Sequence, residues 1–93
     1  MYKILIAEDE LLLTGAYTLK FTKSGFEVIN VGDGEEIFNV LIHFMPDILL
    51  LDLVMPKMGG VQVLKKLKFE NYKVPVIITS NLSTPNLINE CFN

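Results

Sequence analysis

The residues of this sequence best suited to chemistry are a run of three carboxylates and one isolated carboxylate. Glu8, Asp9 and Glu10 end a short apolar segment, and Asp52 directly follows the apolar run Ile48–Leu51. Carboxylates that lie close together repel each other, and burial adds a desolvation cost, so such a cluster favours a bound cation. All-oxygen ligation that leaves room for water is typical of Mg²⁺ or Mn²⁺. The sequence therefore predicts a divalent-metal site, with a solvated acidic first turn of a helix as the alternative interpretation.

Asp52 has the position expected of a nucleophile. It begins the loop Asp52–Gly60, which contains Pro56 and ends in two glycines. A carboxylate that contacts a metal ion and faces solvent can attack a phosphoryl group and form an acyl phosphate, while the metal neutralises charge on the transferring oxygens. We expect Gly59 and Gly60 to allow positive φ and a close backbone approach before the next helix.

Two hydroxyl side chains, Thr79 and Ser80, lie at the end of the apolar run Val74–Thr79. A hydroxyl at the end of a strand can hydrogen-bond a phosphoryl oxygen, and its rotation toward that oxygen can carry a signal to the surface. A hydroxyl that bonds to its local backbone is the simpler interpretation. The pattern alone leaves both interpretations open.

Short apolar runs alternate with segments of helical period along the chain. The runs are too short for helices, and their consecutive apolar residues indicate strands buried on both faces. Strands that alternate with helices predict an α/β, doubly wound parallel sheet, with right-handed crossovers and helices on both faces. Ligands of such sheets bind at the carboxyl ends of the strands, where the candidate residues lie. The predicted strands are Lys3–Ala7, Phe26–Val31, Ile48–Leu51 and Val74–Thr79.

The segments between these strands have predicted helix ends and apolar faces. Gly25 is placed to end the first helix in a left-handed conformation, and Asp33 with Glu36 resembles a capping box that begins the second. Ser83 or Thr84 is placed to cap the last helix. The predicted apolar faces are Leu12, Ala16 and Leu19; Ile37, Leu41 and Phe44; Val61, Val63, Leu64 and Leu67; and Leu87, Ile88, Cys91 and Phe92.

Length and charge limit the classes of function. The chain has 93 residues, 51% of them apolar, which fits one domain. With a net charge of −3 and eight Lys and Arg, it lacks the broad basic surface that phosphate-backbone binding needs, so we expect no direct contact with nucleic acid. One cysteine excludes an intramolecular disulfide, and the acidic run after Ala7 ends the apolar N-terminus well before a membrane span. We expect a cytoplasmic chain that does not enter a membrane.

Three motifs together resemble the receiver domain of two-component response regulators. The stretch from Lys3 to Glu10 is similar to the first strand and acidic pocket of that family, Pro46–Pro56 to its phosphoacceptor strand and loop, and Val74–Ser80 to its fourth strand. The resemblance runs over all 93 residues. It implies a flavodoxin-like sheet of strand order 2-1-3-4 and a signalling domain rather than an enzyme.

The resemblance also implies roles for individual residues of the acidic pocket. Asp52 would be the phosphoacceptor. Asp9, Asp52 and the backbone carbonyl of Val54 would ligate Mg²⁺, or Mn²⁺, directly, whereas Glu8 would act mainly through water.

The same resemblance implies a switch and a partner. Ser80 would be the switch hydroxyl, with Thr79 as the alternative. The phosphoryl group would come from a phosphohistidine of a sensor histidine kinase or a histidine phosphotransfer protein.

The sequence departs from the family after the fourth strand. The family's fifth strand and fifth helix, with a lysine that contacts the phosphoryl oxygen, have no counterpart before Asn93, and we expect Lys57 to be solvated rather than to replace that lysine. An apolar fourth strand at a sheet edge is a template for pairing with another chain. We therefore expect residues 1–93 to be a C-terminally truncated receiver domain, or a homodimer formed through this edge. The alternative function is a non-phosphorylated, receiver-like interaction or dimerisation module.

Overall fold

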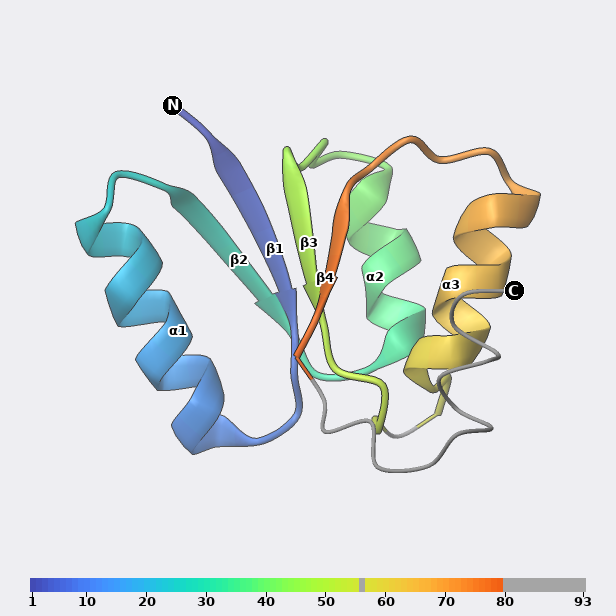
Figure 1. Cartoon of the computed structure of the whole chain (residues 1–93), viewed down its shortest axis with the longest axis horizontal. Coiled ribbons are helices and arrows are strands. Elements are labelled where there is room, and N and C mark those ends of the chain that lie inside the picture. The colour runs from blue at the N-terminus through green and yellow to red at the C-terminus, as the bar shows by residue number, and fades with distance from the viewer. Residues whose placement is uncertain (56, 80–93) are drawn as a thin grey trace.

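The computed structural model of the chain describes residues 1–55 and 57–79, which form one parallel sheet with helices on both faces (Figure 1). Its strand order is β2-β1-β3-β4, as the resemblance to receiver domains implied. The predicted last helix, Ser83 to Phe92, lies outside the described residues. The strands are β1 (Lys3–Ala7), β2 (Glu27–Val31), β3 (Ile48–Leu51) and β4 (Val76–Ile78), and the helices are α1 (Leu11–Lys23), α2 (Gly34–Leu41) and α3 (Gly60–Phe69).

The strand register decides which residues meet at the carboxyl edge of the sheet. Ala7 of β1 lies opposite Leu51 of β3, and Leu51 lies opposite Ile78 of β4. All of the strand pairs are parallel, so the strands point to the same edge, the lower one in Figure 1. One position further along each strand come Glu8, Asp52 and Thr79. The register therefore brings these three residues to neighbouring places.

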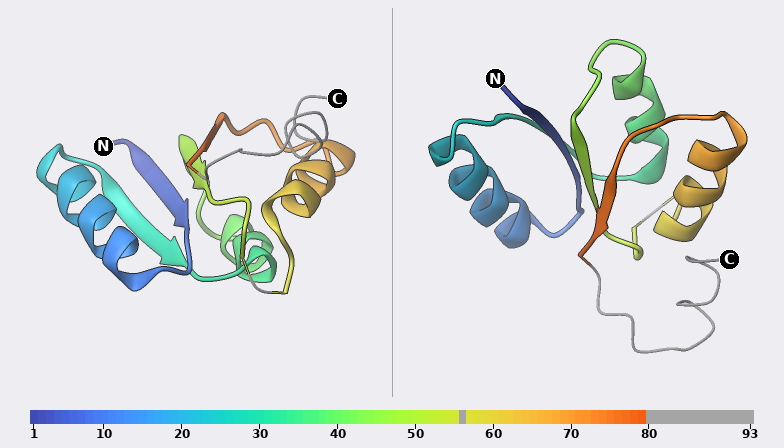
Figure 2. Two further views of the ribbon diagram at one scale, coloured as in Figure 1. Left: turned by 60° about the horizontal axis from the view of Figure 1, so that its bottom comes forward. Right: turned by 45° about the horizontal axis from the view of Figure 1, so that its top comes forward.

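One face of the sheet forms the main core with α2 and α3. Figure 2 shows these two helices on the opposite side of the sheet from α1. Leu5 and Leu49 are fully buried on this face, together with Ile37 of α2 and Val63 of α3. Leu41, Phe44 and Leu67 are buried there as well, and Val61 and Leu64 pack at its margin. The apolar faces predicted for the second and third helices are confirmed.

The apolar face predicted for the first helix is wrong. Leu12 is 84% exposed and Leu19 is 59% exposed, and Ala16 is also exposed. Instead, Tyr17 and Phe21 pack on the other face of the sheet. The segment contains two apolar stripes, and the stripe with the two aromatic rings buries more area against the strands.

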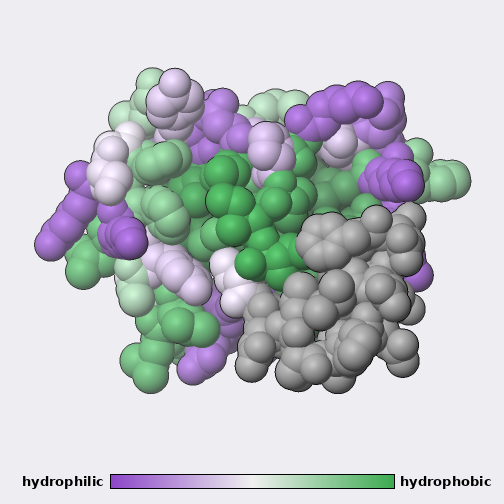
Figure 3. All heavy atoms as spheres, viewed as in Figure 1, coloured by the Kyte–Doolittle hydropathy of each residue, from purple (hydrophilic) through white to green (hydrophobic). Residues whose placement is uncertain are grey.

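The face of the sheet on the α1 side is only partly covered by the described residues. Ile4, Ile6 and Leu50 are buried there. Ile77 of β4 is 49% exposed, and Figure 3 shows apolar side chains gathered at the centre of this face. The described part of the chain thus presents an apolar surface beside the β4 edge, as the sequence led us to expect.

The helix ends predicted at Gly25 and Asp33 are confirmed, the cap predicted at Ser83 or Thr84 lies outside the described residues, and one loop conformation differs from the prediction. Gly25 has a φ of 94°, and the Asp33 carboxylate accepts a hydrogen bond of 3.0 Å from the Glu36 amide. Gly59 has a φ of −71°, and among the described glycines positive φ occurs at Gly25 alone. In the loop after Asp52 the residue in the left-handed region is Lys57, with a φ of 63°.

The close approach predicted at the start of the third helix is confirmed. A Cβ atom on Gly60 would lie 2.7 Å from the Asp52 carbonyl oxygen and would collide with the Leu53 backbone. A Cβ on Gly34, at the start of α2, would likewise collide with Met58. These two glycines let α2 and α3 pack directly on the loop that follows Asp52.

We expect Gly60→Ala to destabilise the fold by about 1–3 kcal/mol, because the backbone of Asp52 and Leu53 would have to shift. Gly15→Ala is the matched control, since it lies inside α1 with nothing within 4 Å of an added Cβ. That change should stabilise the chain by about 0.5–1 kcal/mol. Urea denaturation measures both, and equal effects of the two substitutions would contradict the close-approach argument.

Candidate functional site

Three carboxylates from two separate segments converge at the carboxyl edge of the sheet. Glu8 and Asp9 follow β1, Asp52 follows β3, and one oxygen of each lies within 4.8 Å of the others. Glu8 is buried, Asp52 is half-buried and Asp9 is exposed. An all-carboxylate donor set that opens to solvent on one side fits Mg²⁺ or Mn²⁺. The sequence prediction that these residues come together is confirmed.

Hydrogen bonds fix the backbone of the segment that carries Glu8. Its amide donates to the Val31 carbonyl at 3.0 Å, and its carboxylate accepts from the Glu10 amide at 3.0 Å. Its carbonyl accepts a 3.1 Å hydrogen bond from the Thr14 hydroxyl on α1. The sequence reasoning missed Thr14, because a threonine within a helix carries no pattern that indicates such a contact.

The environment of Glu8 shows the repulsion expected of clustered carboxylates. Burial raises the pKa of Glu8, and the nearby charges of Asp52 and Asp9 raise it further, whereas the hydrogen bond from the Glu10 amide lowers it. Ionising Glu8 therefore costs more here than in water, and a nearby cation would offset that cost.

Two backbone contacts orient Asp52. Its amide donates to the Ala7 carbonyl at 2.9 Å, which extends the β1–β3 pairing by one step. Its carboxylate accepts a 3.0 Å hydrogen bond from the Val54 amide. The Val54 side chain itself is 71% exposed. Asp52 is thus held by its neighbours while it remains half-exposed at the rim.

The Thr79 hydroxyl contacts the backbone of the neighbouring strand, which agrees with the simpler of the two interpretations of this residue. Its amide donates to the Leu51 carbonyl at 2.9 Å, and its hydroxyl lies 3.4 Å from the same oxygen. Ser80 lies outside the described residues, so its role as the switch hydroxyl stays a prediction.

An ion pair joins the loop after Asp52 to the start of α2. The Lys57 ammonium lies 3.7 Å from the Asp33 carboxylate, although the Lys57 side chain is 63% exposed. The Lys57 side chain is therefore largely exposed, as expected, but its ammonium group contacts Asp33. The hydrogen bond from the Glu36 amide holds the pKa of Asp33 below its ordinary value, and the Lys57 charge lowers it further.

Comparison with known proteins identifies the family. A sequence model of the response regulator receiver domain matches residues 4–93. The chain belongs to the response regulator receiver family. Receiver domains are signalling domains of two-component systems that bind Mg²⁺ at an acidic pocket and interact with sensor histidine kinases. The present chain has an acidic cluster of its own, formed by Glu8, Asp9 and Asp52.

Individual relatives agree with this assignment. The alkaline phosphatase synthesis transcriptional regulatory protein PhoP of Bacillus subtilis is 32% identical over 76 residues, which are 82% of this chain and 32% of that protein. The receiver domain of the Francisella response regulator 1452 superposes with a TM-score of 0.89 at 28% identity, over 99% of this chain and 76% of that one. The receiver domain described here spans about a third of the length of the curated relatives it matches.

One relative of the chain has a name that refers to DNA binding. The relative MtrA of Mycobacterium tuberculosis, 28% identical over 86 residues, which are 92% of this chain and 38% of that protein, is named a DNA-binding response regulator. The comparisons therefore do not support the expectation that this protein has no nucleic-acid partner.

None of the helices in residues 1–55 and 57–79 is long and apolar enough to cross a membrane.

We expect Thr14→Val to weaken Mg²⁺ binding about 2- to 10-fold, the range of one neutral hydrogen bond, because the Glu8 segment loses its contact with α1. Titration calorimetry measures this affinity. Thr14→Ser keeps the hydroxyl and should keep the affinity. Thr18→Val removes a similar hydroxyl one turn away, which donates to the Thr14 carbonyl. An equal loss of Mg²⁺ affinity in Thr18→Val would mean that the effect comes from the general stability of α1 and not from the contact between Thr14 and Glu8.

Asp33→Asn tests the charge at the start of α2. Because the folded-state pKa of Asp33 lies below its ordinary 3.8, the ionised carboxylate stabilises the fold above that pH, and its contribution is lost as the pH falls through the folded-state value. The wild-type chain should therefore be more stable than the variant near neutrality, with a gap that closes in acid. Thermal denaturation over a pH series measures the gap, and a constant gap would contradict the assigned charge effect.

Proposed function

We propose that this receiver domain accepts a phosphoryl group on Asp52 from a phosphohistidine of a sensor histidine kinase or a histidine phosphotransfer protein. The observation that carries the proposal is the convergence of Glu8, Asp9 and Asp52 around a solvent-facing position. We assign direct metal ligation to Asp9, Asp52 and the Val54 carbonyl, and an indirect role through water to Glu8. Bound Mg²⁺ would neutralise charge on the transferring oxygens.

The residues of the chain supply orientation and the nucleophile. A carboxylate oxygen of Asp52 forms a bond to phosphorus while the bond from phosphorus to the histidine nitrogen breaks and its electron pair returns to the imidazole ring. The hydrogen bond from the Val54 amide keeps the Asp52 carboxylate in a fixed orientation. The product is an aspartyl phosphate, and the imidazole is the leaving group.

Phosphorylation changes the surface of the domain through a hydroxyl at the end of β4. We assign this role to Ser80, with Thr79 as the alternative. Thr79 is tied to the Leu51 carbonyl, so it would have to break this contact before it turned toward a phosphoryl oxygen.

The second candidate function is an interaction module that is not phosphorylated. The apolar surface beside β4, with Ile77 49% exposed, favours a partner at this edge. Under either function we place residues 1–93 in one receiver domain, whose β4 edge is covered by further chain of the same protein or by a second copy in a homodimer.

The intact mass of the chain after incubation with a small-molecule phosphodonor separates the two functions. We expect a gain of one phosphoryl group that requires Mg²⁺ and is lost in Asp52→Asn. Asp47→Asn is the matched control, because Asp47 is an exposed carboxylate outside the cluster that accepts a 2.7 Å hydrogen bond from the Lys3 amide. Absence of any gain in a folded chain would overturn phosphoryl acceptance by this chain and favour the interaction module.

A further inference from the structure

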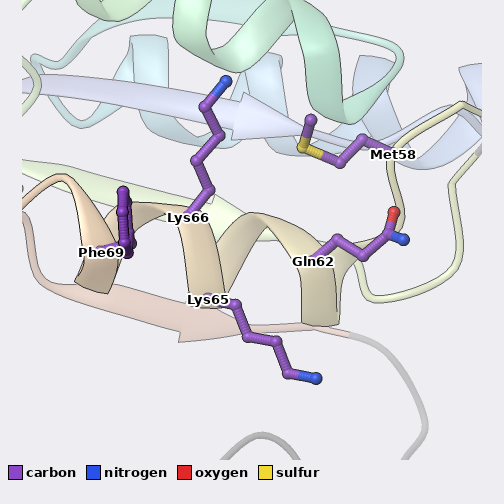
Figure 4. Close-up of a pocket in the computed structure, with 5 residues that line it drawn as sticks. All are labelled: Met58, Gln62, Lys65, Lys66 and Phe69. Carbon is purple, nitrogen blue, oxygen red and sulfur yellow. The ribbon is translucent and has the colours of Figure 1, made fainter.

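A hollow on the surface of α3 lies apart from the carboxylate cluster. It has a volume of about 540 Å³, and its lining residues are Met58, Gln62, Lys65, Lys66 and Phe69. Four of these residues recur along one side of α3, and Met58 reaches the hollow from the loop that follows Asp52 (Figure 4). The hollow is therefore a feature of one helix face and of the loop that leads into it.

Phe69 gives this hollow an apolar anchor point. Its side chain is 89% exposed, although Val63 and Leu67 of the same helix are buried in the core. A large exposed aromatic side chain within a polar surround is typical of a protein-binding surface, because a partner can remove its whole area from water. The main core that the described residues form does not shield Phe69 from water.

The charge of this region is strongly positive within an acidic chain. Lys57, Lys65, Lys66, Lys68 and Lys73 are five of the eight basic residues. Glu70 is the single acidic residue of the range 57–79. The net charge of the whole chain is −3, so positive charge is concentrated at α3 and its flanks.

Two lysines frame the hollow. The Lys66 ammonium lies 4.3 Å from the centroid of the Phe38 ring of α2 and 3.7 Å from the Glu70 carboxylate. Figure 4 shows Lys66 pointing toward α2 and Lys65 pointing the opposite way, with Gln62 before them and Phe69 after them along the helix. A bound segment lying along α3 would meet one ammonium group on each side.

We propose that this α3 face binds an acidic amphipathic helix of a protein partner, with an aliphatic side chain against Phe69 and carboxylates facing Lys65 and Lys66. The inference does not depend on phosphorylation of Asp52. A protein helix is favoured over nucleic acid because five of the eight basic residues lie on α3 and its flanks, the remainder of the chain is acidic, and the hollow offers an apolar contact. The positive charge around the hollow and its apolar lining together suit an acidic amphipathic helix.

The test uses a designed helical peptide with leucines at positions i, i+3, i+4 and i+7 and glutamates on both flanks, titrated into the isotopically labelled chain and followed by NMR. We expect saturable shifts confined to α3 and Met58. Phe69→Ser and Lys65→Glu should each weaken binding about tenfold, as loss of a central contact does. Both side chains are exposed, so the spectra of these variants should otherwise resemble that of the wild type.

Matched controls lie on α1. Leu19→Ser and Lys20→Glu alter an exposed apolar and an exposed basic side chain on the opposite side of the sheet, and they should leave the affinity unchanged. A peptide with lysine in place of glutamate should not bind. The proposal is overturned if the acidic peptide fails to bind, if the lysine peptide binds equally well, or if Phe69→Ser has no effect. Saturable binding of duplex DNA at α3 without peptide binding would also overturn it, and would assign this face to nucleic acid.

Discussion

Three mutually repelling carboxylates are held at one edge of a parallel sheet, and the function proposed for this receiver domain depends on that arrangement. The β1–β3 register places Glu8 beside Asp52, and the hydrogen bond from the Asp52 amide to the Ala7 carbonyl fixes this pair. The strands are held in place by fully buried side chains such as Leu5 and Leu49. Hydrophobic burial therefore holds together charges that would separate in water, and the resulting site favours a cation.

The loop after Asp52 must be fixed as well, because it carries the Val54 amide that orients the carboxylate. Two helices hold this loop through contacts that leave no room for a Cβ atom, at Gly60 on α3 and Gly34 on α2. The ion pair of Lys57 with Asp33 adds a third contact, which its exposure makes weak. The loop that orients the Asp52 carboxylate is thus held mainly by close backbone approach.

The sequence allowed the sheet and the carboxylate cluster to be predicted, because consecutive apolar residues indicate buried parallel strands and their ends then coincide. The face of α1 was predicted wrongly, since Leu12 and Leu19 recur at helical spacing just as Tyr17 and Phe21 do, and the choice falls to the stripe that buries more area against the strands. The Thr14 contact with Glu8 also depends on the angle at which α1 leaves the loop. Sequence periodicity does not encode that angle.

Acidic and basic side chains gather in separate places, so the domain has two surfaces that favour ligands of opposite charge. The carboxylate edge attracts cations, whereas the α3 face attracts carboxylates. Asp52 belongs to the first surface, and Met58, a few residues later in the chain, belongs to the second. A ligand at one surface changes affinity at the other only if the loop that joins these two residues differs between the two states. Because such coupling is reciprocal, a partner that binds α3 more tightly in the phosphorylated state would favour phosphorylation by the same factor at equilibrium. The Met58–Gly34 contact is where this linkage would act, since any displacement of the loop must alter it.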